Sequence, residues 1–177
     1  MSKNLLKLSA LAVVVTAGIV LPRVAGAQTV RAKSAPAVSP VVDLETRARV
    51  LIDTPKKWPE AARMLEEAAG LRAADDARAV DDLIIAAAAH RWAHERAAGR
   101  ATYVAAGERA LALGDVVRAA HAFLCAAVIA HEQKDEAGAW ALKGRAERLA
   151  QSPLLTDSQR NHILAQFVEL KQYAKKP

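Results

Sequence analysis

Two ten-residue segments, 60–69 and 118–127, share one pattern of small and large side chains. Both read x-Ala-Ala-x-x-[Leu/Phe]-x-x-Ala-Ala, which places the alanines on neighbouring turns of a helix around one larger apolar residue. Alanine is the best helix former, and its small side chain lets two helices approach closely while the larger residue fills the gap between them. The repeated pattern therefore predicts an all-α fold of closely packed helices.

The composition points the same way, because 53% of the residues are hydrophobic but only 4% are aromatic. A length of 177 residues suits a single domain. The formal net charge is +6, yet Lys3, Lys7 and Arg23 belong to an N-terminal segment that we expect to be removed, which leaves +3. So small a surplus, mixed with acidic residues, argues against nucleic acid as a partner.

Residues 1–27 have the three-part organisation of a secretory signal peptide. Lys3 and Lys7 precede an apolar run from Leu8 to Leu21, and a small-residue triplet, residues 25–27, predicts cleavage before Gln28. We therefore expect a periplasmic or secreted protein with no stable membrane insertion after cleavage. The alternative is a retained membrane anchor, although the run is shorter than the roughly 20 residues of a spanning helix.

Residues 28–41 mix alanine, serine and proline without an apolar period, which predicts a disordered linker. The only cysteine of the chain is Cys125, so no internal disulfide forms. Because it lies in a very apolar segment, we interpret it as a small buried side chain.

Helical periodicity, with breaks at Gly, Pro and Asp, extends over residues 42–177. It predicts seven helices, at about 42–53, 58–73, 76–97, 100–113, 115–132, 135–151 and 156–174. The fifth is apolar on almost every side, so we expect it to lie centrally. The seventh begins with Thr156-x-x-Gln159, which matches a reciprocal capping box.

An aromatic residue stands one turn before a glycine in two of these helices, as Tyr103-x-x-x-Gly107 and Trp140-x-x-x-Gly144. Glycine inside a helix costs about 1 kcal/mol relative to alanine, so we expect both glycines to have a packing role.

The segment from Tyr103 to Ala126 resembles the tetratricopeptide repeat family. The residues in the register of that helix-turn-helix unit are Tyr103, Gly107, Gly114, Asp115, Ala119, Phe123 and Ala126. Trp140 and Gly144 suggest a following unit, and Ala61, Leu65 and Ala68 an earlier one. This register implies that Trp140 lies in the core. The sequence departs from the family's pattern because no proline closes the second helix near His131 to Asp135 and because the third helix is unpaired.

The resemblance implies a right-handed superhelix of stacked antiparallel helix pairs with a groove that binds peptides or proteins. The groove positions would be Val104, Glu108, Leu111, Ala141, Arg145 and Arg148. Arg145 and Arg148 would favour an acidic or carboxylate-ended partner, because guanidinium groups bind carboxylates through two hydrogen bonds.

His90 and His94 are four residues apart, which on one helix would place both imidazoles on the same face, as in helical zinc sites. A third ligand is not evident, and Leu83, Ala87, His90 and His94 also read as an inward stripe. The pairs Asp75-Asp76 and Asp81-Asp82 are interpreted as capping residues at the start of the third helix.

The sequence contains no phosphate-binding glycine loop, no CxxC pair and no histidine at a spacing that indicates a catalytic triad. We therefore expect no catalysis and no cofactor. The resemblance to tetratricopeptide repeats implies a scaffold or adaptor that binds protein or peptide partners, and with the signal peptide we expect it in the cell envelope, as a monomer. Two alternatives remain: a zinc protein that uses His90 and His94, and a structural protein that associates with itself.

Overall fold

The computed structural model describes residues 39–173, with side chains up to Phe167. Within this part of the chain all regular structure is helical, as the sequence predicted. The elements are α1 (Pro40–Ile52), the short 3-10 helix η1 (Pro55–Lys57), α2 (Trp58–Leu71), α3 (Arg78–Trp92), α4 (Arg96–Ala112), α5 (Val116–Glu132), α6 (Glu136–Ala150) and α7 (Asp157–Tyr173). None of these helices is long and apolar enough to cross a membrane.

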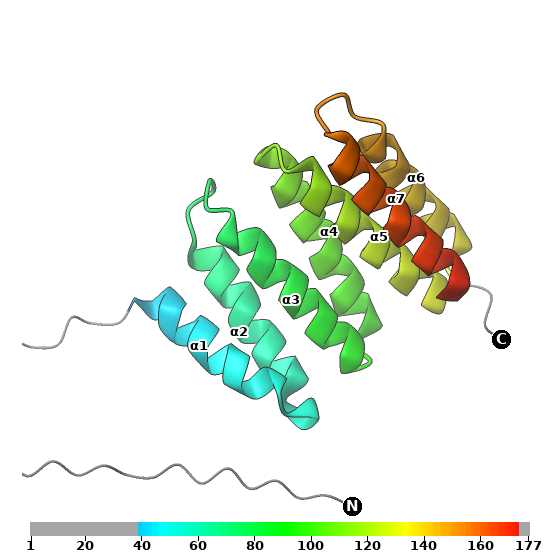
Figure 1. The fold of residues 1–177 in the computed structure, drawn as a ribbon. Coiled ribbons are helices and arrows are strands. Elements are labelled where there is room, and N and C mark those ends of the chain that lie inside the picture. The colour runs from blue at the N-terminus through cyan, green and yellow to red at the C-terminus, as the bar shows by residue number, and fades with distance from the viewer. Residues whose placement is uncertain (1–38, 174–177) are drawn as a thin grey trace, which may run out of the picture. The chain divides into compact units, whose positions relative to one another are not determined.

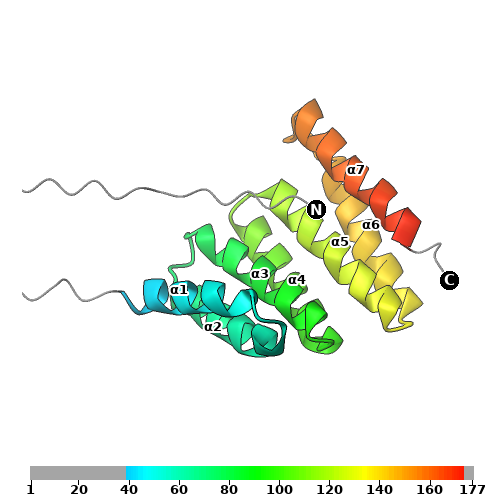
Figure 2. The ribbon, with the colours of Figure 1, turned by 60° about the horizontal axis from the view of Figure 1, so that its bottom comes forward.

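The helices follow one another through the domain in chain order (Figure 1), and each of α1 to α6 packs against its successor. The helix α5 also contacts α3 and α7, so α3, α5 and α7 form one layer, with α4 and α6 behind it (Figure 2). Nine residues of α5 are buried, which confirms its predicted central position.

Three consecutive connections have the same backbone geometry. A residue with positive φ stands in each, at His94, Gly114 and Lys134, and these positions recur every twentieth residue. The residue after each donates its backbone N–H to a carbonyl of the preceding helix, and the three bonds, Glu95 to His90, Asp115 to Ala110 and Asp135 to Ala130, measure 2.8–3.0 Å. Each turn thus reverses the chain in the same way.

The first of these turns corrects the predicted third helix, 76–97. The helix ends at Trp92, and a new helix begins at Arg96 instead of residue 100. The periodicity was misleading because the turn contains no glycine: His94 itself takes the left-handed conformation, with φ 62°.

At the N-terminal end, α1 begins at Pro40, two residues before the predicted start. Proline suits the first turn of a helix because its missing N–H would have no partner there. The predicted linker is therefore too long at its C-terminal end. The predicted signal peptide and the linker up to residue 38 lie outside the described residues.

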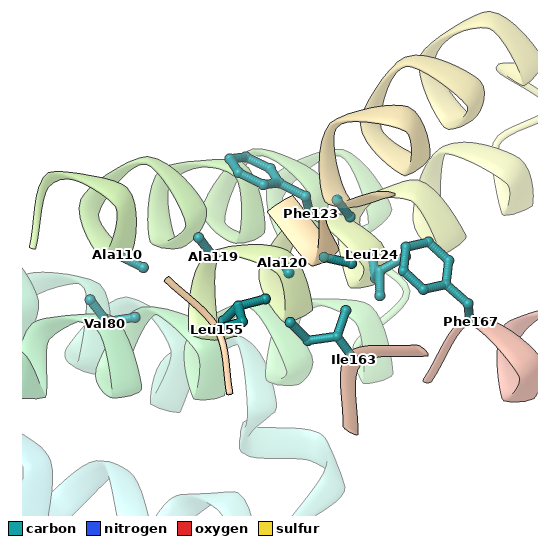
Figure 3. Close-up of a cluster of buried hydrophobic side chains, with 11 residues drawn as sticks. Val80, Ala110, Ala119, Ala120, Phe123, Leu124, Leu155, Ile163 and Phe167 are labelled. Atoms are coloured by element: carbon teal, nitrogen blue, oxygen red, sulfur yellow. The ribbon is translucent and has the colours of Figure 1, made fainter. Parts of the chain in front are cut away.

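The largest core cluster joins α3 to α7 (Figure 3). Phe123 and Leu124 of α5 lie at its centre, and Ile163 of α7 covers one side. The capping box of α7 is present, because the Gln159 N–H donates to Thr156 Oγ1 at 3.2 Å and the Thr156 N–H donates to Gln159 Oε1 at 2.9 Å.

A buried charge network ties α1, α2 and α3 together. The side chain of Arg72, only 4% exposed, pairs with Glu45, with Asp76 at 3.1 Å and with Asp82 at 2.8 Å. Burial alone would lower the pKa of Arg72, but the hydrogen bonds to Asp82, Glu45 and Asp76 outweigh it and raise that pKa. The guanidinium therefore stays charged.

This network corrects one reading of the acidic pairs. Asp82, predicted as a capping residue at the start of the third helix, is 2% exposed and pairs with Arg72. Asp76 does support the start of α3, because its Oδ1 accepts the N–H of Arg78 at 3.0 Å.

Candidate functional site

The outward side chains of α4 and α6 form a mostly apolar surface. Its members are exposed and are, on α4, Ala101, Ala105, Glu108 and Ala112, and, on α6, Ala137, Trp140, Ala141 and Arg148. We call this surface the α4–α6 face. It includes three of the six predicted groove residues, Glu108, Ala141 and Arg148, whereas Val104, Leu111 and Arg145 are half-buried beside it.

Glu108 of α4 and Arg145 of α6 form an ion pair across this face. Their side chains form a bidentate ion pair, in which Arg145 Nη2 donates to Glu108 Oε2 at 2.7 Å. The Arg145 guanidinium also lies 4.0 Å from the ring centroid of Phe123, a cation–π contact. The hydrogen bond from Arg145 lowers the pKa of Glu108, so the pair is charged at neutral pH.

The two arginines predicted to recognise a carboxylate therefore differ. Arg145 already has Glu108 as its partner, whereas Arg148 is exposed and forms no ion pair within the described residues. The structure places Arg148 one helical turn after Gly144, with Nη1 near the backbone. Arg148 is therefore the positively charged residue of the α4–α6 face that is available to bind an anion.

Trp140 was predicted in the core, but it is 66% exposed. The Nζ atom of Lys143 lies 4.9 Å from its ring centroid, and Lys143 also pairs with Glu147. The following Gly144 has no tight neighbour, since an added Cβ would meet only Arg148 Nη1 at 3.6 Å. The packing role predicted for Gly144 is therefore wrong, because the aromatic ring points outward.

The pairing of His90 with His94 on one helical face is also wrong, because α3 ends at Trp92. His90 is 4% exposed, whereas His94 is exposed in the turn that follows. Groups of three or more side chains with the geometry of a metal site do not occur within residues 39–167.

The His90 imidazole contacts two carboxylates. Its Nδ1 lies 2.7 Å from Glu95 Oε2 and its Nε2 lies 3.2 Å from Glu66 Oε1, which also accepts the hydroxyl of Thr102 at 2.6 Å. Since α2, α3 and α4 each contribute to this cluster, it fixes these helices together. Both imidazole nitrogens are occupied, so neither is available to a substrate or metal.

A pocket of about 750 Å³ opens beside this cluster, at the α3–α4 turn and the C-terminal end of α5. Its charged lining has both signs, from Arg63, Arg96, Glu95 and Glu132. Arg96 pairs with Glu132 at 3.4 Å, so these charges largely satisfy one another. The mixed lining favours a structural surface over a site for one charged ligand.

Comparisons of the chain with protein-family models, with curated proteins and with solved structures gave no match.

Proposed function

We propose that this chain is an exported, tetratricopeptide-like scaffold whose α4–α6 face binds a protein or peptide partner, without catalysis. The observation that carries the proposal is that Trp140 and Arg148 are both exposed on one face of α6, on a surface otherwise built largely of alanine. Tryptophan and arginine dominate binding hot spots, and small neighbours leave room for a partner's side chains.

The α4–α5 pair supports the comparison with tetratricopeptide units. Tyr103, Ala119, Phe123 and Ala126 are all buried, as the register of that unit requires. One difference is length, since a turn at every twentieth residue makes a helix pair of forty residues, against 34 in a tetratricopeptide unit. The proposed family relationship is accordingly a distant one with lengthened helices.

The partner is expected to present an acidic segment or a C-terminal carboxylate. Arg148 is available to bind it, and Trp140 supplies apolar area for the neighbouring residues. We propose that the protein itself is a monomer.

Export is proposed from residues 1–27. Protein recovered from the envelope fraction is expected to begin at Gln28, which N-terminal sequencing or intact mass measures. A chain that keeps Met1 in the membrane fraction would instead indicate a retained anchor.

Site-specific photocrosslinking tests the binding surface. A photoreactive residue at Ala141, on the α4–α6 face, is expected to yield one discrete crosslinked protein in cells. The same residue at Thr46, on the exposed side of α1, serves as the positional control. Crosslinks of the same identity and yield from both positions would contradict a specific face.

Substitutions on the α4–α6 face, with one control substitution away from it, make this test more specific. Trp140→Ala and Arg148→Glu are expected to remove the Ala141 crosslink, whereas Arg47→Glu, at an exposed arginine of α1, keeps it. Loss of the crosslink in all three variants would indicate a general effect of charge or folding. Retention in Trp140→Ala and Arg148→Glu would refute the proposed function of this face.

A further inference from the structure

The helices α4 and α6 run in the same direction. The chain reverses at Gly114, before α5, and again at Lys134, before α6. The ion pair between Glu108 and Arg145 joins residues that are 37 positions apart in the sequence. Because both helices rise by the same distance per residue, this pair sets which residues of α4 and α6 lie level with each other.

The alanines of the two helices therefore lie level on the α4–α6 face. The offset of 37 residues places Ala105 opposite residue 142, next to Ala141, and it places Ala101 next to Ala137. All four alanines are exposed. Small side chains four residues apart, on two neighbouring helices that run in the same direction, leave room for the backbone of a third helix to approach closely.

The same face offers little to the backbone of an extended peptide. Its polar members are Glu108, which Arg145 already binds through two hydrogen bonds, and Arg148. The backbone N–H and C=O groups of α4 and α6 are used within their own helices. An extended peptide would cover its own N–H and C=O groups with alanine and lose their hydrogen bonds to water, which is costly. A helix satisfies these groups internally and avoids this cost.

Trp140 and Arg148 set the side-chain pattern of the occupant. They are eight positions apart on α6, which corresponds to about 12 Å, or about two helical turns. A helix that lies along α6 covers the same distance with about eight residues. It therefore places an acidic residue against Arg148 and, about two turns away, an apolar residue against the Trp140 ring.

We propose that the α4–α6 face binds an amphipathic α-helix of its protein partner, and not an extended segment. This inference rests on the proposed function of the same face and adds the conformation and the side-chain pattern of the partner. The level alanines and the backbone requirement select a helix, and Arg148 selects an acidic residue on it.

Crosslinking from several positions of α4 measures the conformation of the bound segment. A benzophenone amino acid is placed singly at Ala101, Ala105 and Ala112 of the full chain, so that Trp140 and Arg148 stay intact. Mass spectrometry then identifies the partner residue that each position reaches. The distance from Ala101 to Ala112 along α4 is about 16 Å.

A helical partner covers this distance with about 11 residues, and an extended partner covers it with about 5. The partner residues crosslinked from Ala101 and Ala112 are therefore expected to lie about 11 positions apart in one protein. Those crosslinked from Ala101 and Ala105 are expected about four positions apart. The same amino acid at Thr46, on the exposed side of α1, is the control and is expected to leave this partner unlabelled.

A bulky side chain between the two helices provides a second measurement. Ala105→Leu fills the space that a helical backbone needs, so the yield of the crosslink from Ala101 is expected to fall at least about fivefold through overpacking. Thr46→Leu adds a leucine at an exposed position of α1 and is the matched control. An extended segment does not need so close an approach of its backbone, and it would keep the crosslink in both variants.

A separation of about five residues between the outer crosslinks, or an undiminished crosslink in Ala105→Leu, would overturn the helical occupant. Crosslinks from Ala101 and Ala112 in two different proteins would overturn it as well. After either of the first two results the face still binds one protein, so the proposed function stands. If no position of α4 gives a crosslink, or Thr46 gives the same one in equal yield, the proposed function itself is refuted.

Discussion

Gly107 of α4 lies against the ring of Phe123 of α5 so closely that no larger residue fits. A Cβ added to Gly107 would stand 2.7 Å from both Cε1 and Cζ of that ring. Phe123 is fully buried and also carries the Arg145 guanidinium 4.0 Å from its centroid. The absence of a side chain at Gly107 therefore leaves the space into which Phe123 of the next helix packs.

Gly107→Ala is expected to destabilise the domain, although alanine is the better helix former. Overpacking costs about 1–3 kcal/mol, and the gain in helix propensity of about 1 kcal/mol offsets part of it. We expect a net loss of up to about 2 kcal/mol in the free energy of unfolding, measured with urea. Gly144→Ala is the control, and there the propensity gain should dominate, since no neighbour is closer than 3.6 Å. Equal effects of the two variants would contradict this packing.

Arg72→Met is expected to be strongly destabilising. It leaves Asp82, 2% exposed, without its cation, and breaking a buried pair costs about 3–5 kcal/mol. Arg78→Met is the control, because the Arg78 side chain is 70% exposed and its pair with Asp76 adds little. Thermal unfolding measures both, and a loss for Arg72→Met no greater than that for Arg78→Met would show that the network is not a source of stability.

In the three recurring turns, introducing glycine and replacing glycine by alanine should have opposite effects on the stability of the domain. Lys134 adopts φ 62°, a conformation that costs a non-glycine residue about 1 kcal/mol, so Lys134→Gly should stabilise the domain slightly. Gly114 has φ 74°, so Gly114→Ala should lower the free energy of unfolding of the domain by about 1 kcal/mol. Chemical denaturation of both variants measures these effects. Gly70→Ala, within α2 and with open space around it, should instead stabilise, which separates turn geometry from a general effect of glycine.

Stability is expected to fall in acid through Asp135, the N-cap of α6. The N–H of Gly138 and then the Arg100 side chain lower the pKa of this carboxyl below its ordinary value. Because the folded state lowers the pKa, the stabilisation is present above the unfolded pKa of about 3.9 and is lost as pH falls through the folded value. Asp135→Asn keeps a capping acceptor but does not titrate.

The unfolding midpoint in urea, measured from pH 5 to pH 2, checks this prediction. Wild type is expected to lose more stability than Asp135→Asn over that range, so the two curves converge in acid. Parallel curves would mean that Asp135 does not contribute to the acid dependence.

Local patterns succeeded where neighbouring residues decide the outcome. Helix type, the capping box at Thr156 and the central position of α5 were predictable, because helical periodicity and side-chain capping depend on residues within one or two turns. The turn at His94 was missed because a histidine, and not a glycine, adopts the left-handed conformation there, so the sequence carries no glycine that marks the turn.

The sequence by itself determined that this chain folds into packed helices, since alanine spacing and apolar periodicity are properties of one helix at a time. The tertiary structure decided which side chains meet: Arg72 with Asp82, Arg145 with Phe123, and Gln166 with His121. These pairs come from different helices, and their contacts depend on the rotation and offset of one helix against another. For the same reason Trp140 is exposed.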